Sequence, residues 1–213
     1  MALAGGAVID GGAGFRYISS AGLLLNGTGA YAQTAAPVVR TNDSFTLLGW
    51  VLNTQRPSTA RTVFSQAGAN TNVFALRYVP DAAEPTERGG WRLEMKNADN
   101  ADDGQAPLRV VTHPQFNEWD WDHVAIVYDA LRDRMSLYVN GALHQSEGGV
   151  SQENDVLGFV ASNGGLQVGR DKLDATQFWP HAVDDVWVYQ GALTATQVAQ
   201  LAGGDELPTE DGP

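Results

Sequence analysis

Carboxylate and imidazole side chains are the first candidates for catalysis in this chain. Hydrolysis of a glycosidic bond needs two carboxyl groups about 5–10 Å apart. Glu94 lies in an alternating segment, but Arg92 and Lys96 stand two residues away on either side, which favours charge pairing between strands. The four histidines have no metal-type spacing, and no Gly-x-Ser-x-Gly motif occurs. The sequence therefore predicts a protein that is not an enzyme.

Aromatic side chains offer a second kind of chemistry, because a sugar stacks its C–H face on an exposed ring. Val186 and Val188 share one face of a predicted strand, so the two-residue period puts Trp187 and Tyr189 on the other face. The candidate ligand-binding residues are these two, together with Trp119 and Trp179 in loop-like segments. For each of the four, burial in the interior is the alternative.

Short segments rich in β-branched and aromatic residues must position these side chains. The alternation in Trp91–Lys96 is typical of a strand with one buried face, and Asn140-Gly141 between two such segments predicts a tight hairpin turn. A helix is predicted only over Thr194–Leu201, where Thr194 and Gln197 match a capping box. Strands are predicted over 45–52, 73–79, 91–96, 123–128, 135–139 and 183–189. The expected fold is all-β, with packed antiparallel sheets and one short C-terminal helix.

Composition excludes several functions. The chain has 213 residues, no cysteine, 13 Lys and Arg, and 25 Asp and Glu, for a net charge of −12. Nucleic-acid binding depends on clustered Lys and Arg, so a nucleic-acid partner is not expected. Without cysteine, thiol catalysis, disulfides and Cys-ligated zinc are excluded. The longest apolar run, Ala21–Leu25, is too short to cross a bilayer, so no membrane insertion is expected.

Three blocks in order, at 42–51, 121–141 and 183–194, resemble a laminin-G-like domain of the bacterial, concanavalin A-like lectin/glucanase type. The resemblance covers about Leu23 to Leu201 and implies a two-sheet antiparallel jelly-roll sandwich. It also implies a non-catalytic module of a larger secreted or cell-surface protein. Glucanases of this fold carry a Glu-x-Asp-x-Glu string, which is absent here. We divide the chain into a lead-in with a first strand (1–22), the jelly-roll domain (23–203) and an acidic linker or tail (204–213).

Calcium is the cofactor that the sequence leaves open. Ca²⁺ binds several oxygen ligands, and some laminin-G-like domains hold a structural calcium ion. Asp184 and Asp185 begin the last long strand, and Asn42 and Asp43 precede an early one, so neighbouring strands would bring the two pairs together. A carboxylate bonded to nearby backbone amides explains Asp184 equally well.

Two functions follow from these residues. The first is a carbohydrate-binding module, whose ligand is a glycan. The alternative is a structural or protein-interaction module without a sugar site, which packs against neighbouring domains of its parent protein. An exposed tryptophan in a groove would favour the first, and a flat apolar patch would favour the second.

Overall fold

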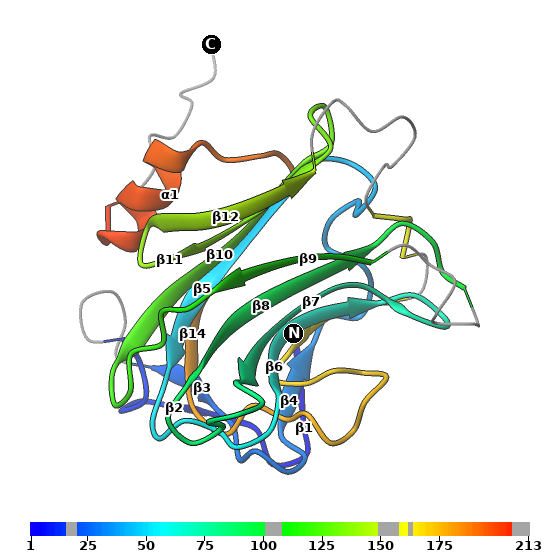
Figure 1. Ribbon diagram of the computed structural model, residues 1–213. Coiled ribbons are helices and arrows are strands. Elements are labelled where there is room, and N and C mark those ends of the chain that lie inside the picture. Colours follow the sequence, from blue (N-terminus) through cyan, green and yellow to red (C-terminus); the bar gives the residue numbers. More distant parts are fainter. Residues whose placement is uncertain (16–20, 101–107, 149–157, 162–163, 206–213) are drawn as a thin grey trace.

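The computed structural model describes residues 1–15, 21–100, 108–148, 158–161 and 164–205. They form two seven-stranded sheets that lie face to face (Figure 1). In sheet order, sheet A contains β1 (Ala2–Ala4), β4 (Tyr31–Gln33), β13 (Leu166–Val168), β6 (Arg61–Ala67), β7 (Asn72–Pro80), β8 (Gly89–Lys96) and β9 (Leu108–His113). Sheet B contains β12 (Ala142–Gly148), β11 (Arg134–Val139), β10 (Trp121–Asp129), β5 (Phe45–Leu52), β14 (Val183–Tyr189), β3 (Gly22–Leu24) and β2 (Val8–Asp10).

Adjacent strands within both sheets pair antiparallel, which confirms the predicted two-sheet sandwich. Trp91, Leu93 and Met95 on β8 are fully buried, while the side chains between them face outward from sheet A. The period-two pattern therefore identified the inner face of this strand correctly. Apolar side chains from both sheets meet in one large cluster that includes Phe45, Phe74 and Ile126.

The local turn and helix signals are also confirmed. Asn140 and Gly141 join β11 to β12 with φ values of 51° and 76°, the positive angles that a type I′ turn requires. Helix α1 (Ala195–Ala202) begins after Thr194, whose side chain and that of Gln197 form the predicted capping box.

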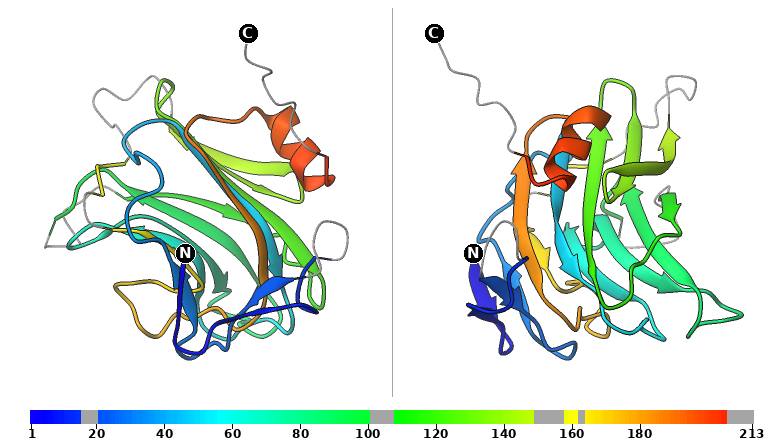
Figure 2. Two further views of the ribbon diagram at one scale, coloured as in Figure 1. Left: turned by 180° about the vertical axis from the view of Figure 1, so that it is seen from behind. Right: turned by 90° about the vertical axis from the view of Figure 1, so that its left-hand side faces the viewer.

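Helix α1 lies on the outer face of sheet B (Figure 2). Val198 of the helix is fully buried against a small apolar cluster that includes Leu48, Ala125 and Tyr138. Within the described residues, no helix is long and apolar enough to cross a membrane.

The N-terminal lead-in is part of the sandwich. β1 pairs with β4 at the edge of sheet A, and β2 pairs with β3 at the edge of sheet B. Phe15 then stacks on Trp50 with ring centroids 3.8 Å apart. The division placed at residue 22 therefore does not separate the lead-in from the domain. Residues 206–213 of the predicted tail lie outside the described residues.

Candidate functional site

The outer face of sheet A carries an open cavity of about 500 Å³. Its floor is made by outward-facing residues of β7 and β8, among them Ala75, Arg77 and Glu94. The segment after β13 forms one wall and contributes Asp171, Leu173 and Gln177. We call this cavity the Arg77 groove.

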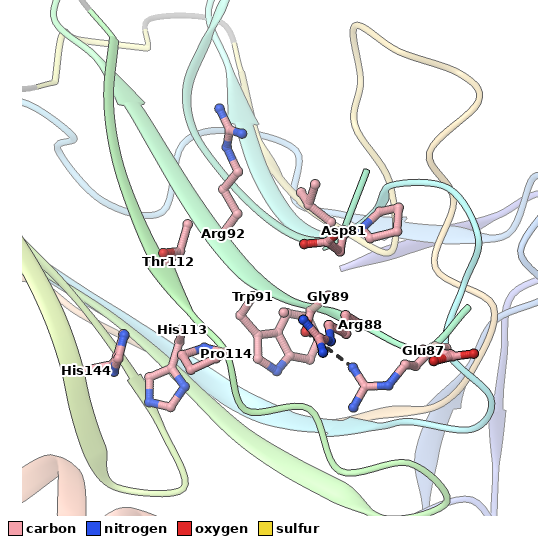
Figure 3. A pocket seen from close by; sticks show the side chains of 14 residues that line it. Asp81, Glu87, Arg88, Gly89, Trp91, Arg92, Thr112, His113, Pro114 and His144 are labelled. Atoms are coloured by element: carbon pink, nitrogen blue, oxygen red, sulfur yellow. Dashed lines mark hydrogen bonds between the residues drawn. The ribbon is translucent and has the colours of Figure 1, made fainter. Parts of the chain in front are cut away.

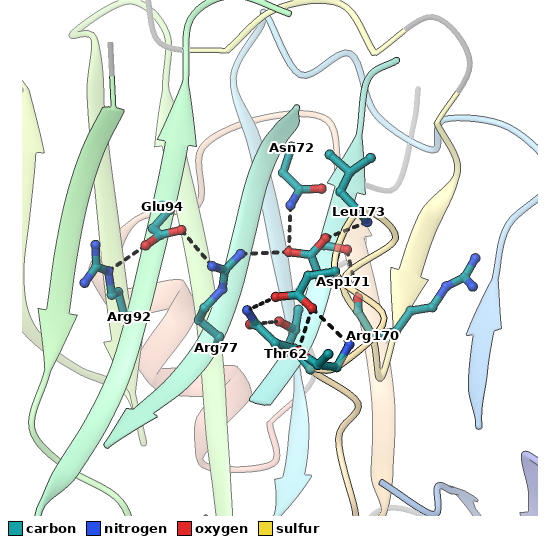
Figure 4. A network of polar contacts seen from close by, with 12 residues as sticks. Thr62, Asn72, Arg77, Arg92, Glu94, Arg170, Asp171 and Leu173 are labelled. Atoms are coloured by element: carbon teal, nitrogen blue, oxygen red, sulfur yellow. Dashed lines mark hydrogen bonds and ion pairs between the residues drawn. The ribbon is translucent and has the colours of Figure 1, made fainter. Parts of the chain in front are cut away.

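Arg77 is held between two carboxylates on the floor of the Arg77 groove (Figure 4). Its two terminal nitrogens lie 3.1 Å from Glu94 Oε2 and 2.9 Å from Asp171 Oδ2. Glu94 Oε1 lies 2.7 Å from Nε of Arg92, so four charged side chains form one chain of contacts. The prediction that Glu94 pairs with cations of its own sheet is confirmed.

Asp171 is only 3% exposed, although it borders an open cavity. Asn72 Nδ2 donates to Asp171 Oδ2 at 2.8 Å, and the backbone N–H of Leu173 donates to Asp171 Oδ1 at 2.8 Å. With Arg77, three donors therefore fix this carboxylate. Preorganised polar groups of this kind set the orientation of a ligand without a further ordering cost.

The wall segment is itself anchored to sheet A. Ser65 Oγ donates to the carbonyl of Arg170 at 2.9 Å, and Thr62 Oγ1 donates to Gln177 Oε1 at 3.1 Å. The Arg170 guanidinium lies 3.4 Å from the centre of the Tyr31 ring, which is a cation–π contact. The wall and the floor of the Arg77 groove thus form one connected unit.

The turn at the top of the Arg77 groove is held by a third carboxylate. Asp99 accepts hydrogen bonds from the backbone N–H groups of Ala69, Asn70 and Thr71, at 2.7–3.0 Å. Burial by itself would raise the pKa of Asp99, but these three donors hold it below its ordinary value. Asn70 and Thr71 line the groove, so Asp99 positions its upper rim.

A second cavity of about 500 Å³, which we call the His144 cavity, is lined by Arg92, His113 and His144 among others (Figure 3). It adjoins the Arg77 groove, because Arg92 of its lining forms the ion pair with Glu94 of the groove. The rings of His113 and His144 lie 5.3 Å apart, edge to face. Burial lowers the pKa of His113, and the neighbouring His144 lowers it further. His113 Nδ1 accepts a hydrogen bond from the backbone N–H of Gln115, which holds the ring in place.

The four predicted aromatic residues have different environments. Trp187 is 56% exposed on the outer face of sheet B, beside the buried Leu48 of β5. Tyr189 is half-buried against the cluster under helix α1. Trp119 is 72% exposed in the segment between β9 and β10, with a φ of 62°.

The prediction that Trp179 binds a ligand is wrong. Its side chain is fully buried in the core, 5.5 Å from the ring of Trp91. The loop around residue 179 lacks the two-residue period that distinguishes an inner from an outer face, so its sequence gave no sign of this burial. None of the other three aromatic candidates lines the Arg77 groove.

The four predicted calcium ligands do not come together. Asp184 pairs with Trp50 near one end of β5, whereas Asn42 and Asp43 precede the other end of that strand. Five steps of extended strand separate Phe45, the first residue of β5, from Trp50, a distance of about 17 Å. No group of three or more His, Cys, Asp or Glu side chains is suited to hold a metal within the part of the chain that the structure describes. The proposed four-residue calcium site is therefore wrong.

The acidic pair in β14 has a structural arrangement. Asp184 accepts hydrogen bonds from the backbone N–H groups of Phe15 and Asp185, at 2.8 and 2.9 Å. Asp185 lies at a register shift and has a φ of 44°. Burial raises the pKa of Asp185, and the adjacent Asp184 raises it further. These contacts agree with the alternative explanation, in which Asp184 bonds to nearby backbone amides.

Sequence comparison identifies the family. The profile of the Laminin_G_3 family, described as concanavalin A-like lectin/glucanases superfamily, matches residues 26–199. The chain belongs to this superfamily. Comparison of the Laminin_G_3 chain with curated protein sequences gave no match.

Solved structures that are similar in fold to this Laminin_G_3 domain include the following three. The first is Domain 4 of a GH43 extracellular arabinanase from Geobacillus stearothermophilus, in complex with arabinotriose, with a TM-score of 0.60, 20% identity, and coverage of 93% of this chain and 82% of that one. The second is a heptameric SAP-like pentraxin from Limulus polyphemus, with a TM-score of 0.58, 18% identity, and coverage of 81% and 74%.

The third is the ligand-binding domain of botulinum neurotoxin serotype D in complex with N-acetylneuraminic acid. Its TM-score is 0.61 at 12% identity, and the match covers 93% of this chain but only 46% of that one. At these identities the comparisons show the lectin-like fold of the Laminin_G_3 domain.

Sequence reasoning missed the Arg77 groove. Arg77 and Asp171 are 94 residues apart in the chain, and they meet only because the segment after β13 folds over β7. The one local sign was the charge alternation at Arg92, Glu94 and Lys96, which marked the outer face of β8.

Proposed function

We propose that this chain is a non-catalytic carbohydrate-binding module and that its glycan lies in the Arg77 groove. One observation carries the proposal: a guanidinium clamped between two carboxylates on the floor of an open cavity. Sugar hydroxyls both donate and accept hydrogen bonds, so a fixed array of charged donors and acceptors suits them. The carbohydrate complexes of two domains with the same fold support this assignment.

The same contacts argue against hydrolysis. A glycosidase needs one carboxyl group that carries a proton and delivers it to the leaving oxygen. Both oxygens of Glu94 contact guanidinium groups, and both oxygens of Asp171 accept hydrogen bonds. Both carboxylates are therefore already engaged with donors of the protein itself.

We place the parent protein outside the cell, either secreted or at the cell surface. The extracellular arabinanase domain, which has the same fold, supports this location. In such a protein the module would keep the parent protein bound to the glycan. No membrane partner is required.

The test begins with a glycan array on the full chain, followed by titration calorimetry of the hits. When an oligosaccharide that binds in the array is added, the NMR chemical shifts of residues in β7, β8 and the segment after β13 should change. Those of β14 and α1 should not. Arg77→Met removes the clamp and should weaken binding at least tenfold. The matched control is Arg40→Met, because the Arg40 side chain is 74% exposed and does not line the groove.

Thermal melts of both variants separate lost binding from lost folding. Arg77→Lys keeps the charge and supplies a second, milder change if Arg77→Met fails to fold. Unchanged affinity in a folded Arg77 variant would contradict the assignment of the groove. Release of reducing sugar from a bound oligosaccharide would contradict the non-catalytic assignment.

The interaction module remains a second candidate because Trp187 is 56% exposed on the opposite face. A protein or a neighbouring domain that covers sheet B would bury this ring. This candidate would be favoured if the array gave no glycan hit and the NMR signal of the Trp187 indole shifted in the presence of an adjacent domain.

A further inference from the structure

Each arginine that lines the two cavities already has a carboxylate partner. In the Arg77 groove, Arg77 contacts Glu94 and Asp171. In the His144 cavity, Arg56 contacts Glu118 at 3.1 Å and Arg88 contacts Glu84 at 2.6 Å. Arg92, which stands between the cavities, contacts Glu94. The guanidinium groups thus serve as hydrogen-bond donors whose charge is balanced within the protein.

The charges of the Arg77 groove balance as a set. The groove and Arg92 contribute three cations, Arg77, Arg92 and Lys96, and three anions, Glu94, Asp171 and Asp174. The whole chain carries a net charge of −12. A sugar carboxylate would therefore approach a negative protein, and it would have to displace a protein carboxylate to reach a guanidinium.

We infer that the ligand of the Arg77 groove is a neutral glycan, recognised through its hydroxyl groups, and that acidic sugars are excluded. This inference rests on the proposed carbohydrate-binding function. The Arg77 ion pairs then serve two purposes. They hold the donors and acceptors in place for hydroxyl groups, and they leave no uncompensated positive charge for a carboxylate or sulfate.

The first experiment compares neutral with acidic glycans at two salt concentrations. The neutral probes are arabino- and xylo-oligosaccharides, and the acidic probes are oligogalacturonides and oligosaccharides that end in N-acetylneuraminic acid. Calorimetry at about 0.01 and about 1 M salt covers Debye lengths from about 30 to about 3 Å. We expect a neutral glycan to bind with an affinity that changes by less than about twofold between the two salts.

The outcomes separate the inference from the function. Binding of an acidic glycan that weakens at high salt would overturn the inference and leave the carbohydrate-binding function standing. If no probe binds at either salt and the array gives no hit, the proposed function fails and the inference fails with it.

The second experiment changes the charge of the groove. Glu94→Gln releases the contacts of one carboxylate with Arg77 and Arg92, so the groove gains one positive charge. We expect this variant to gain about tenfold in low-salt affinity for an acidic probe and to lose affinity for the neutral glycan. Asp43→Asn makes the same change in net charge at an exposed ion pair that does not line the groove, and it should alter neither affinity. An equal gain in both variants would contradict the local explanation.

Discussion

Two carboxylates are almost equally buried in this protein, but their surroundings differ. Asp122 is fully buried between the sheets, and Asp171 is 3% exposed beside an open cavity. Asp122 accepts hydrogen bonds from Trp91 Nε1, Asn53 Nδ2, Asn140 Nδ2 and the backbone of Asn117, at 2.7–3.3 Å. Asp171 instead contacts a cation that faces solvent. Burial alone therefore does not distinguish a structural carboxylate from a site carboxylate; the type of partner and the access of water do.

The largest effect should come from Asp122→Ala. This change leaves the indole N–H of Trp91, two side-chain amides and one backbone N–H without their acceptor inside the protein, and it removes a hydrogen-bonded link between the two sheets. We expect a loss of about 4 kcal/mol in the free energy of unfolding, measured by urea denaturation. A loss below about 1 kcal/mol would show that the Asp122 contacts are not structural.

A third buried titratable group, His123, sharpens the comparison because its surroundings differ again. His123 on β10 is 1% exposed, and neither ring nitrogen has a hydrogen-bond partner among the residues that the structure describes. Burial lowers its pKa to about 4 from an ordinary value of 6.5. Between these two values the unfolded chain binds the proton and the folded chain does not, so acidification favours unfolding.

We expect His123 to remove about 3 kcal/mol of stability as the pH falls from 7 to 4. The phenylalanine of His123→Phe cannot be protonated. In this variant the free energy of unfolding, measured by urea denaturation at each pH, should therefore change less between pH 7 and pH 4. An identical pH dependence in the variant and the wild type would show that His123 is not the cause.

Asp171→Ala should weaken both binding and folding, but it should destabilise the protein less than Asp122→Ala does. Arg77 keeps Glu94 as a partner, so the expected loss of stability is about 2 kcal/mol. Glycan affinity should fall about tenfold because Arg77 and Asn72 lose the group that orients them. If Asp171→Ala and Asp122→Ala destabilise the protein equally and leave binding intact, the distinction between the two carboxylates fails.

Trp187→Ala tests the opposite face. The indole is more than half exposed, so its removal should cost less than about 1 kcal/mol of stability. Glycan affinity should not change if the sugar lies in the Arg77 groove. A tenfold weaker affinity in calorimetry would instead place the sugar at Trp187, one of the four candidate binding residues predicted from the sequence.

The smallest effect concerns calcium. Both oxygens of Asp184 already accept backbone hydrogen bonds, and Asn42 and Asp43 lie at the far end of β5. Excess chelator should therefore leave the melting temperature unchanged. A drop of several degrees that added calcium reverses would restore calcium as a structural cofactor.

Period-two patterns and turn chemistry predicted the fold, because both are local. Trp187 was placed on the correct side of β14 since its two valine neighbours pack toward the core. The same rule does not apply to Trp179, because that residue lies in a loop without a two-residue period. The calcium site failed because neighbouring strands meet in a register that the sequence does not state, and β5 and β14 run antiparallel. The Arg77 groove depends on a contact across 94 residues, for which no local pattern exists.

The place of β14 in sheet B has a consequence for biosynthesis. This strand lies between β5 and β3, although it is the last strand in the described part of the chain. When residues 1–182 have left the ribosome, β14 is not yet available. The edge of β5 that will pair with β14 is therefore unpaired, in the middle of the future sheet. Such unpaired apolar edges aggregate, and the long loop that must close makes folding slow. We expect nascent chains to stay competent for chaperone binding until β14 emerges and joins the two halves of the sheet.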